Sequence, residues 1–317
     1  MSYGNAQSGS PRDPLRGHGP PPDTDWAPEP ERRRLLGGRP WTLTLAALVP
    51  LCLIGFLIWQ SAGGHRPGNS SAGHAHSGAH GGAGGKNGSR EKPLASRTVV
   101  LDPGHNPHNR DHPHEIGRRV GIGNGKTSCD TTGTDTDSGY PEAKFTLDLA
   151  HRVRTLLEKQ GAKVELTQNG HRAWGPCVTE RAAAGNKAHA DATVSLHADG
   201  APAGNRGFHV ILPASVHRGR ADTSGITAPS ARLGRQLRTA FRHSTGERPA
   251  DYLGDRKGLD KRSDLGGLNL SRVPKVFLEC GNMRDPRDAR RLTDSGWRER
   301  AAHGVADGIA RYLRDGR

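Results

Sequence analysis

Aromatic side chains are scarce in this sequence. Phe, Trp and Tyr make up only 4% of its 317 residues, although the formal net charge is +14. Proteins that bind nucleic acid strands commonly stack bases on aromatic rings, so this scarcity argues against nucleic acid as the partner of the positive charge. The charge favours instead an anionic envelope, a membrane surface or a wall polymer, with an ordinary solvated face as the alternative.

Charged residues are missing from one segment, which runs from Trp41 to Trp59. At about 1.5 Å per residue a helix of this length nearly spans the ~30 Å hydrocarbon core of a bilayer. Tryptophans at both ends suit the two interfaces, and the arginines of Arg32–Arg39 favour a cytoplasmic N-terminus. We therefore predict a transmembrane signal anchor over residues 41–60, with a cleaved signal peptide and a buried core helix as the alternatives.

The segments beside this anchor lack large apolar side chains. Residues 1–40 are rich in Pro, Gly and Arg, and we predict that they form a disordered cytoplasmic N-terminus. Residues 61–96 are rich in Gly, Ser and His, as is typical of a flexible linker. Residues 97–317 are then an extracytoplasmic domain of a single-pass membrane protein, or of a secreted protein if the anchor is cleaved.

Cysteine is sparse, and its four positions show neither a CxxC pair nor another recognised zinc-binding spacing. Cys129 and Cys177 fall in loop-like sequence of the predicted exported domain, where a disulfide is permitted. We predict that these two cysteines form a disulfide. Because spacing alone does not establish pairing, a structural zinc site is the rival interpretation.

Apolar runs and amphipathic stretches alternate through the exported domain. Short strands are expected at 98–101, 163–167, 192–196, 208–212 and 275–278. Helices are expected to start at Pro141 and to cover 178–189, 228–243 and 297–313, whereas residues 106–139 read as a long polar loop. Strands that alternate with helices indicate an α/β fold.

Three of these strands end in a side chain that binds metal or exchanges protons: His105, His197 and Glu279. Glu142 lies in the first turn of the helix that begins after Pro141. Because ligands of α/β sheets gather beyond the carboxyl ends of strands, these groups are expected to converge. Two histidines and a carboxylate can hold zinc, and a second carboxylate can serve as base.

Several motifs occur in one order along the domain: LDPGH, a glutamate some forty residues later, ERAAAGN, SLHAD, GFHVIL and VPKVFLECGN. In this combination the domain, over roughly residues 97–314, resembles the zinc-dependent N-acetylmuramoyl-L-alanine amidases of the type 3 class, which are bacterial peptidoglycan hydrolases. The resemblance implies a mixed, mostly parallel sheet of about six strands flanked by helices. It also implies Zn²⁺ ligands at His105, Glu142 and His197, a catalytic carboxylate at Glu279, and peptidoglycan as substrate. We expect the chain to be a monomer.

The sequence leaves alternatives open for the roles of two residues and for the function of the protein. Arg181, within ERAAAGN, either binds a substrate carboxylate or holds a carboxylate of the fold. Glu279 is either the catalytic base or a structural carboxylate paired to Arg181 or Arg284. The function is the amidase activity, another zinc-dependent peptidoglycan peptidase, or an inactive module that binds the envelope.

Overall fold

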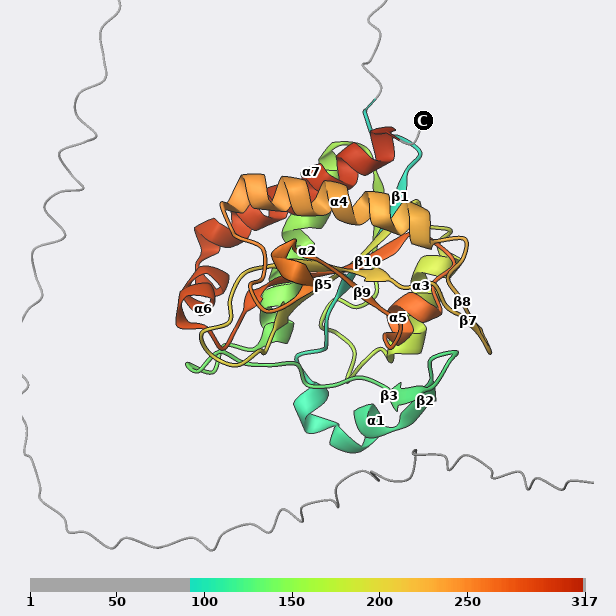
Figure 1. Ribbon diagram of the computed structural model, residues 1–317, viewed down its shortest axis with the longest axis horizontal. Helices are drawn as coiled ribbons and strands as arrows, with labels where there is room; N and C mark the ends of the chain where they lie inside the picture. Colours follow the sequence, from blue (N-terminus) through green and yellow to red (C-terminus); the bar gives the residue numbers. More distant parts are fainter. Residues whose placement is uncertain (1–91, 316–317) are drawn as a thin grey trace, which may run out of the picture. The chain divides into compact units, whose positions relative to one another are not determined.

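The computed structural model describes residues 92–315, and a six-stranded sheet forms their centre (Figure 1). In order across the sheet, the strands are β4 (Lys163–Leu166), β1 (Thr98–Pro103), β5 (Ala192–Asp199), β10 (Lys275–Asn282), β6 (His209–Pro213) and β9 (Leu259–Arg262). The first four strands are parallel, β6 is antiparallel to β10, and β9 is parallel to β6. The predicted mixed, mostly parallel sheet is therefore confirmed.

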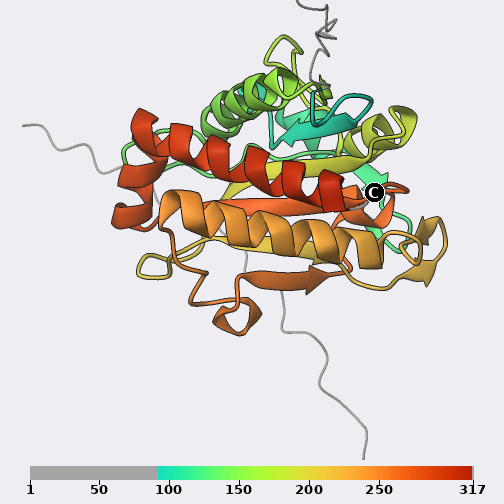
Figure 2. The same cartoon turned by 90° about the horizontal axis from the view of Figure 1, so that it is seen from above.

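Three long helices cover one face of the sheet (Figures 1 and 2). They are α2 (Glu142–Lys159), α4 (Thr227–Thr245) and α7 (Ser295–Asp315), and α6 (Pro286–Thr293) leads into the last of them. Each long helix buries the apolar stripe that its sequence predicts, for example Leu233, Leu237 and Phe241 in α4. The shorter helices α3 (Val178–Lys187) and α5 (Gly266–Asn269) pack together beside the other face.

The two faces of the sheet differ in polarity because side chains alternate along a strand. In β5 and β10, Val194, Leu196, Val276 and Leu278 join the apolar core under α2, α4 and α7. The residues between them point to the opposite face. They include Ser195, His197, Phe277 and Glu279, so the polar face carries the residues of interest.

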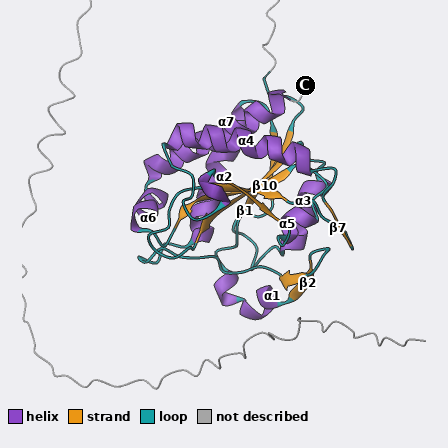
Figure 3. Ribbon diagram, viewed as in Figure 1, coloured by secondary structure: helices purple, strands orange, loops and turns teal. Residues whose placement is uncertain are grey.

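The predicted long loop at 106–139 is wrong in part, because this segment contains short elements (Figure 3). These are η1 (Asn109–Asp111), α1 (Pro113–Gly117) and the antiparallel pair β2 (Arg119–Gly121) and β3 (Lys126–Ser128). Elements this short do not contain enough residues to show a periodic pattern of apolar side chains, so the sequence does not reveal them. The pair β7 (His217–Arg218) and β8 (Ala221–Asp222), the turn η2 (Gly254–Arg256) and strand β9 were likewise not predicted.

The predicted disulfide between Cys129 and Cys177 is confirmed, and its Cα atoms lie 4.3 Å apart. It joins the segment after β3 to the residue that precedes α3. Cys129 and Cys177 are both buried, and the N–H of Val178 donates a hydrogen bond to the Cys129 carbonyl. The β2–β3 pair is thereby attached to the start of helix α3.

The predictions for 1–40, for the anchor at 41–60 and for most of the linker at 61–96 lie outside the described residues. Within the described part, Leu94 is fully buried and its N–H donates to the Gln160 carbonyl. The packed domain thus includes residues just before the predicted boundary at 97. Among the helices of residues 92–315, none combines the length and apolarity required to cross a bilayer.

Candidate active site

The sheet brings the predicted site residues together at the carboxyl ends of its parallel strands. His105 follows β1, Glu142 is the first residue of α2, and His197 and Glu279 lie in the neighbouring strands β5 and β10. The β5–β10 register places Glu279 directly beside His197. Pairing of strands, rather than proximity in sequence, therefore assembles the site.

His105, Glu142 and His197 form a compact cluster whose candidate ligand atoms all lie within 4.8 Å of one another. Nε2 of His105 is 3.1 Å from Oε2 of Glu142, and Nδ1 of His197 is 2.9 Å from Oε1 of the same carboxylate. The two imidazole rings meet edge to face with centroids 5.0 Å apart. Two nitrogen donors and one carboxylate thus face a common point.

Backbone groups orient these side chains. The Thr131 carbonyl lies 3.0 Å from Nδ1 of His105, so it can accept the N–H of that nitrogen and leave Nε2 free to bind a metal. The N–H groups of Thr134 and Ala198 donate to the two oxygens of Glu142 at 3.0 Å and 3.1 Å. Each carboxylate oxygen is therefore held in place by a main-chain donor.

Four polar residues that flank the candidate ligands have other partners. They are Asp102, Asn106, Ser195 and Asp199, and in the described structure none of them forms a hydrogen bond with His105 or His197. The group that approaches the His105 ring is the Thr131 carbonyl, which belongs to a segment distant in sequence.

Charges within the site shift the pKa values in opposite directions. Burial lowers the pKa of His105, but the neighbouring Glu142 and Asp130 outweigh burial and raise it to about 10. Burial raises the pKa of Glu142, but His105 and His197 outweigh that effect and lower it. The cluster therefore favours positive charge at its centre, as a cation site should.

Glu279 is different from the other site residues because its carboxylate has no partner. Within residues 92–315 it forms no ion pair and accepts no side-chain hydrogen bond, and Arg284 pairs with Asp137 instead. Burial raises the pKa of Glu279 well above its usual value, and the carboxylates of Glu142 and Asp199 raise it further. A free carboxylate that readily holds a proton is suited to acid–base work.

Arg181 lies under the site in a buried ion network. The guanidinium has five N–H groups, and its hydrogen bonds go to the carbonyl oxygens of Pro103, His105 and Pro176 and to the carboxylates of Asp102 and Asp130. No donor remains for a substrate carboxylate. Of the two predicted roles, the structure favours that of holding carboxylates in the fold.

Asp102 is the second centre of this network and is fully buried. Its Oδ2 lies 3.0 Å from Nζ of Lys275, which is also fully buried, and accepts from Ser195 at 2.9 Å. Because Arg181 also bonds the His105 carbonyl, the network fixes the turn that carries the first histidine. Lys275 could not be predicted as a member of this network, since a lysine within an apolar strand indicates a buried partner but does not identify it.

Two glycines leave room for the cluster. A Cβ atom at Gly104 would lie 2.3 Å from Cε1 of His197. At Gly133, where φ is +78°, it would lie 2.8 Å from Cδ2 of His105 and 2.9 Å from Oε2 of Glu142. Neither glycine has a sequence signal of this role, although Gly104 stands inside the LDPGH motif.

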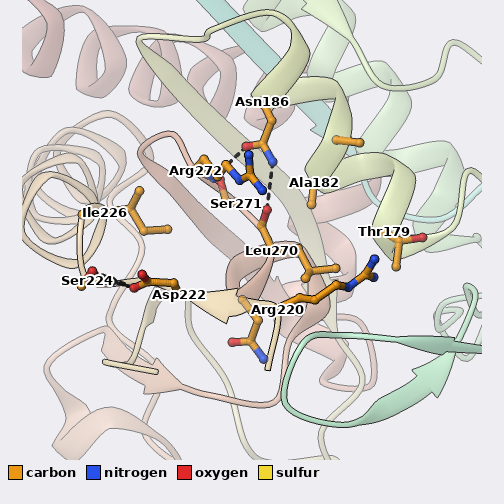
Figure 4. Close-up of a pocket in the computed structure, with 13 residues that line it drawn as sticks. Thr179, Ala182, Asn186, Arg220, Asp222, Ser224, Ile226, Leu270, Ser271 and Arg272 are labelled. Atoms are coloured by element: carbon orange, nitrogen blue, oxygen red, sulfur yellow. Dashed lines mark hydrogen bonds between the residues drawn. The ribbon is translucent and has the colours of Figure 1, made fainter. Parts of the chain in front are cut away.

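One cavity of the described residues opens onto the cluster, and a larger one lies elsewhere in the domain. A cavity of about 160 Å³ reaches His105 and His197 and is walled by Val178, Leu265 and Phe277, on whose ring His197 stacks. A larger cavity of about 740 Å³ lies between α3, α5 and the turn before α4, and Figure 4 shows its lining. The larger cavity contains none of the four site residues, so size alone does not locate the chemistry.

A cluster of three metal-binding side chains with a free carboxylate beside it is the arrangement of metal-assisted hydrolases. Residues 99–311 match the model of a family described as N-acetylmuramoyl-L-alanine amidase. The N-acetylmuramoyl-L-alanine amidase Rv3717 of Mycobacterium tuberculosis is 40% identical over 222 residues, which cover 69% of this chain and 88% of that protein.

Crystal structures of similar sequence agree with this match. The N-acetylmuramyl-L-alanine amidase Ami1 of Mycobacterium smegmatis is 39% identical with a TM-score of 0.64, covering 70% of this chain and 99% of that one. Ami1 of Mycobacterium abscessus is 39% identical with a TM-score of 0.63, covering 69% of this chain and 100% of that one. The chain therefore belongs to the N-acetylmuramoyl-L-alanine amidase family.

Proposed function

We propose that this protein hydrolyses the amide bond between N-acetylmuramic acid and L-alanine in peptidoglycan, with zinc as cofactor. The observation that carries the proposal is the convergence of His105, Glu142 and His197 beside the unpaired Glu279. Family membership supports the activity.

The donor set fits zinc. Catalytic zinc sites commonly have three protein ligands of imidazole and carboxylate type and keep a further position for water or substrate. Here Glu142 is oriented by two main-chain donors, and His105 is oriented through its other nitrogen. Zinc bound there would supply Lewis acidity, polarising a carbonyl and lowering the pKa of water.

Glu279 performs the proton transfers in this proposal. Its carboxylate accepts a proton from the water whose oxygen forms a bond to the lactyl carbonyl carbon. It then gives this proton to the amide nitrogen of L-alanine as the carbon–nitrogen bond breaks. The products are a glycan strand with a free lactyl carboxylate and a peptide with a free amino terminus. The raised pKa of Glu279 suits both steps, because one residue must take up and release the same proton.

Two other functions would use the same fold. A zinc peptidase would cut within the stem peptide and leave muramic acid substituted. An inactive module would bind the envelope without cleavage, and loss of a ligand or of the base would be its mark. All four side chains are present in this chain, which favours an active enzyme.

The place of action also belongs to the proposal. The charge-free segment 41–60 would anchor the chain in the cell membrane, with the catalytic domain outside and acting as a monomer. The disulfide between Cys129 and Cys177 supports an oxidising compartment for this domain. Fractionation of cells, followed by protease treatment of intact spheroplasts, tests the anchor and its orientation.

The activity is tested with the purified full-length chain and peptidoglycan, with and without a chelator, by mass analysis of the products. We expect new L-alanine amino termini only when metal is present. The variant Glu279→Gln should lower turnover by about 10²–10⁴-fold, the usual contribution of general acid–base catalysis. One zinc per chain should remain, because Glu279 is outside the ligand cluster.

Glu158→Gln is the matched control, because Glu158 lies on the surface of α2 and pairs only with Arg154. Its turnover should equal that of the wild type. Full activity of Glu279→Gln would refute the role of this carboxylate. Cleavage inside the stem peptide would refute the amidase in favour of a peptidase.

A further inference from the structure

His209 lies directly opposite Glu279 across the antiparallel pair of β6 and β10. Because side chains of directly paired residues share one face of a sheet, the imidazole and the carboxylate stand on the same side. On the other flank of Glu279, the paired residue of β5 is His197. His197, Glu279 and His209 thus form a row across three adjacent strands, and only the first is in the ligand cluster.

The His209 side chain is buried and has no hydrogen-bond partner among residues 92–315. Its exposed fraction is 2%, and its Nδ1 is among the few buried side-chain atoms of the described residues that lack a partner. Its ring meets the Tyr252 ring edge to face, with centroids 6.1 Å apart. Buried polar atoms are normally hydrogen-bonded, so an unpaired one beside a reaction site requires an explanation.

The surroundings leave Glu279 as the available partner. Asp199, a carboxylate that acts on His209, accepts hydrogen bonds from Tyr252 Oη at 2.8 Å and from the N–H of Gly200. Asp260 and Arg262, on the adjacent strand β9, are the remaining charged groups that act on His209. Glu279 itself has no partner among the described residues, so two unpaired groups occupy paired positions on the same face of β6 and β10.

We propose that His209 is a positioning residue for the catalytic carboxylate. The neutral imidazole donates an N–H, directly or through one water, to the oxygen of Glu279 that does not exchange the proton. This contact would hold the carboxylate in the orientation from which it reaches both the attacking water and the departing amine. The proposal rests on the amidase function above and adds a residue that acts through Glu279 without touching substrate.

Burial is consistent with a neutral ring. It lowers the pKa of His209, although Asp199 and Asp260 oppose this effect. A neutral imidazole carries one N–H donor and one acceptor, so it can stabilise a carboxylate without adding a charge to the site. Loss of the donor should therefore change the rate of the chemical step and leave substrate binding nearly unaltered.

The test compares His209→Phe, which keeps a ring but no donor, with His209→Asn and His209→Gln, which carry amide donors. We expect His209→Phe to lower kcat by about 10–100-fold, the cost of a catalytic group displaced by roughly an ångström. KM should stay within about threefold, and one zinc per chain should remain, since binding and ligands are untouched. At least one amide variant should recover several-fold of the lost kcat.

Val210→Ala is the matched control, because Val210 is the next residue of β6 and points into the apolar core on the other face. It should lower the melting temperature but keep kcat within about threefold, since it leaves Glu279 and its neighbours unchanged. If His209→Phe does not fold, His209→Ala replaces it in the comparison with the amide variants.

Three results would overturn the role of His209: a kcat of His209→Phe within threefold of the wild type, an equal loss in Val210→Ala, or amide variants no better than the phenylalanine. Loss of zinc from a folded His209 variant would also overturn it, because the residue would then support the metal site. A wild-type chain that releases no L-alanine amino termini would instead refute the proposed function.

Discussion

Gly104→Ala should disrupt the proposed zinc site while leaving the fold intact. Gly104 follows β1 at an ordinary φ, so the backbone accepts alanine. The added Cβ, however, would lie 2.3 Å from Cε1, 2.5 Å from Nδ1 and 2.7 Å from Nε2 of His197. Relief of these contacts to a van der Waals distance requires the imidazole to move by about 1 Å. Zinc–nitrogen bonds tolerate deviations of only about 0.2 Å.

We therefore expect zinc affinity to fall at least 10–100-fold and turnover to fall by about 10²-fold, since a shift of this size removes a catalytic group from its position. Overpacking should cost about 1–3 kcal/mol of unfolding free energy, which lowers the melting temperature by a few degrees. Competition with a chromophoric chelator measures the zinc affinity, and thermal unfolding followed by circular dichroism measures stability.

Gly117→Ala is the control, because a Cβ at Gly117, at the end of α1, would meet nothing within 4 Å. Its zinc affinity and turnover should match those of the wild type. If Gly104→Ala bound zinc as tightly as the wild type and kept its turnover, the close approach of Gly104 to His197 would not be a requirement of the site. The inference drawn from this geometry would then be wrong.

Three further predictions concern the ion network, the disulfide and the metal. Asp102→Asn leaves Lys275 and Arg181 buried without their shared carboxylate, so it should cost about 3–5 kcal/mol at pH 7. Burial raises the pKa of Asp102, but Lys275 and Arg181 outweigh burial and lower it. The ionised carboxylate therefore stabilises the folded state fully above pH ~4, and this stabilisation is lost as the pH falls through the lowered pKa. Replacing both Cys129 and Cys177 by serine opens a 48-residue connection and should cost about 2–5 kcal/mol. Chelation should abolish turnover, and added zinc should restore it.

Denaturant unfolding checks the first two of these predictions. For Asp102→Asn, the difference from the wild type should shrink below pH 4, and a constant difference would contradict the ion-pair explanation. The serine double variant should have a lower unfolding free energy than the oxidised wild type but not than the reduced wild type. An equal difference from the reduced wild type would exclude the disulfide as the cause. Turnover that survives complete removal of metal would contradict a metal-assisted mechanism.

Much of the architecture could be predicted from sequence because apolar residues recur at regular spacing along the long helices and strands. The helix expected at 228–243 spans Thr227–Thr245, and that expected at 297–313 spans Ser295–Asp315. The strands β2 and β3, by contrast, lie in a segment whose sequence predicts a loop, because strands of three residues are too short to carry an apolar pattern. Strand β9 was missed for a similar reason: Leu259–Arg262 contains a single apolar residue.

The site, too, could be predicted only in part from the sequence. His105, His197 and Glu279 could be found because each ends or follows an apolar run, and Glu142 because it begins a helix. The groups that orient them could not be found, since a carbonyl such as that of Thr131 has no signature in residue type. Nor did the motif that contains Arg181 reveal that its guanidinium is fully occupied by the fold.

The amino-acid sequence by itself determined the candidate site residues and that each stands at the start or end of a regular element, because local periodicity and turn residues are properties of neighbouring positions. Only the tertiary structure decided which of them meet. The order of the strands and their register place Glu279 between His197 and His209. Such pairing depends on hydrogen bonds between segments far apart in the chain, which no local pattern specifies.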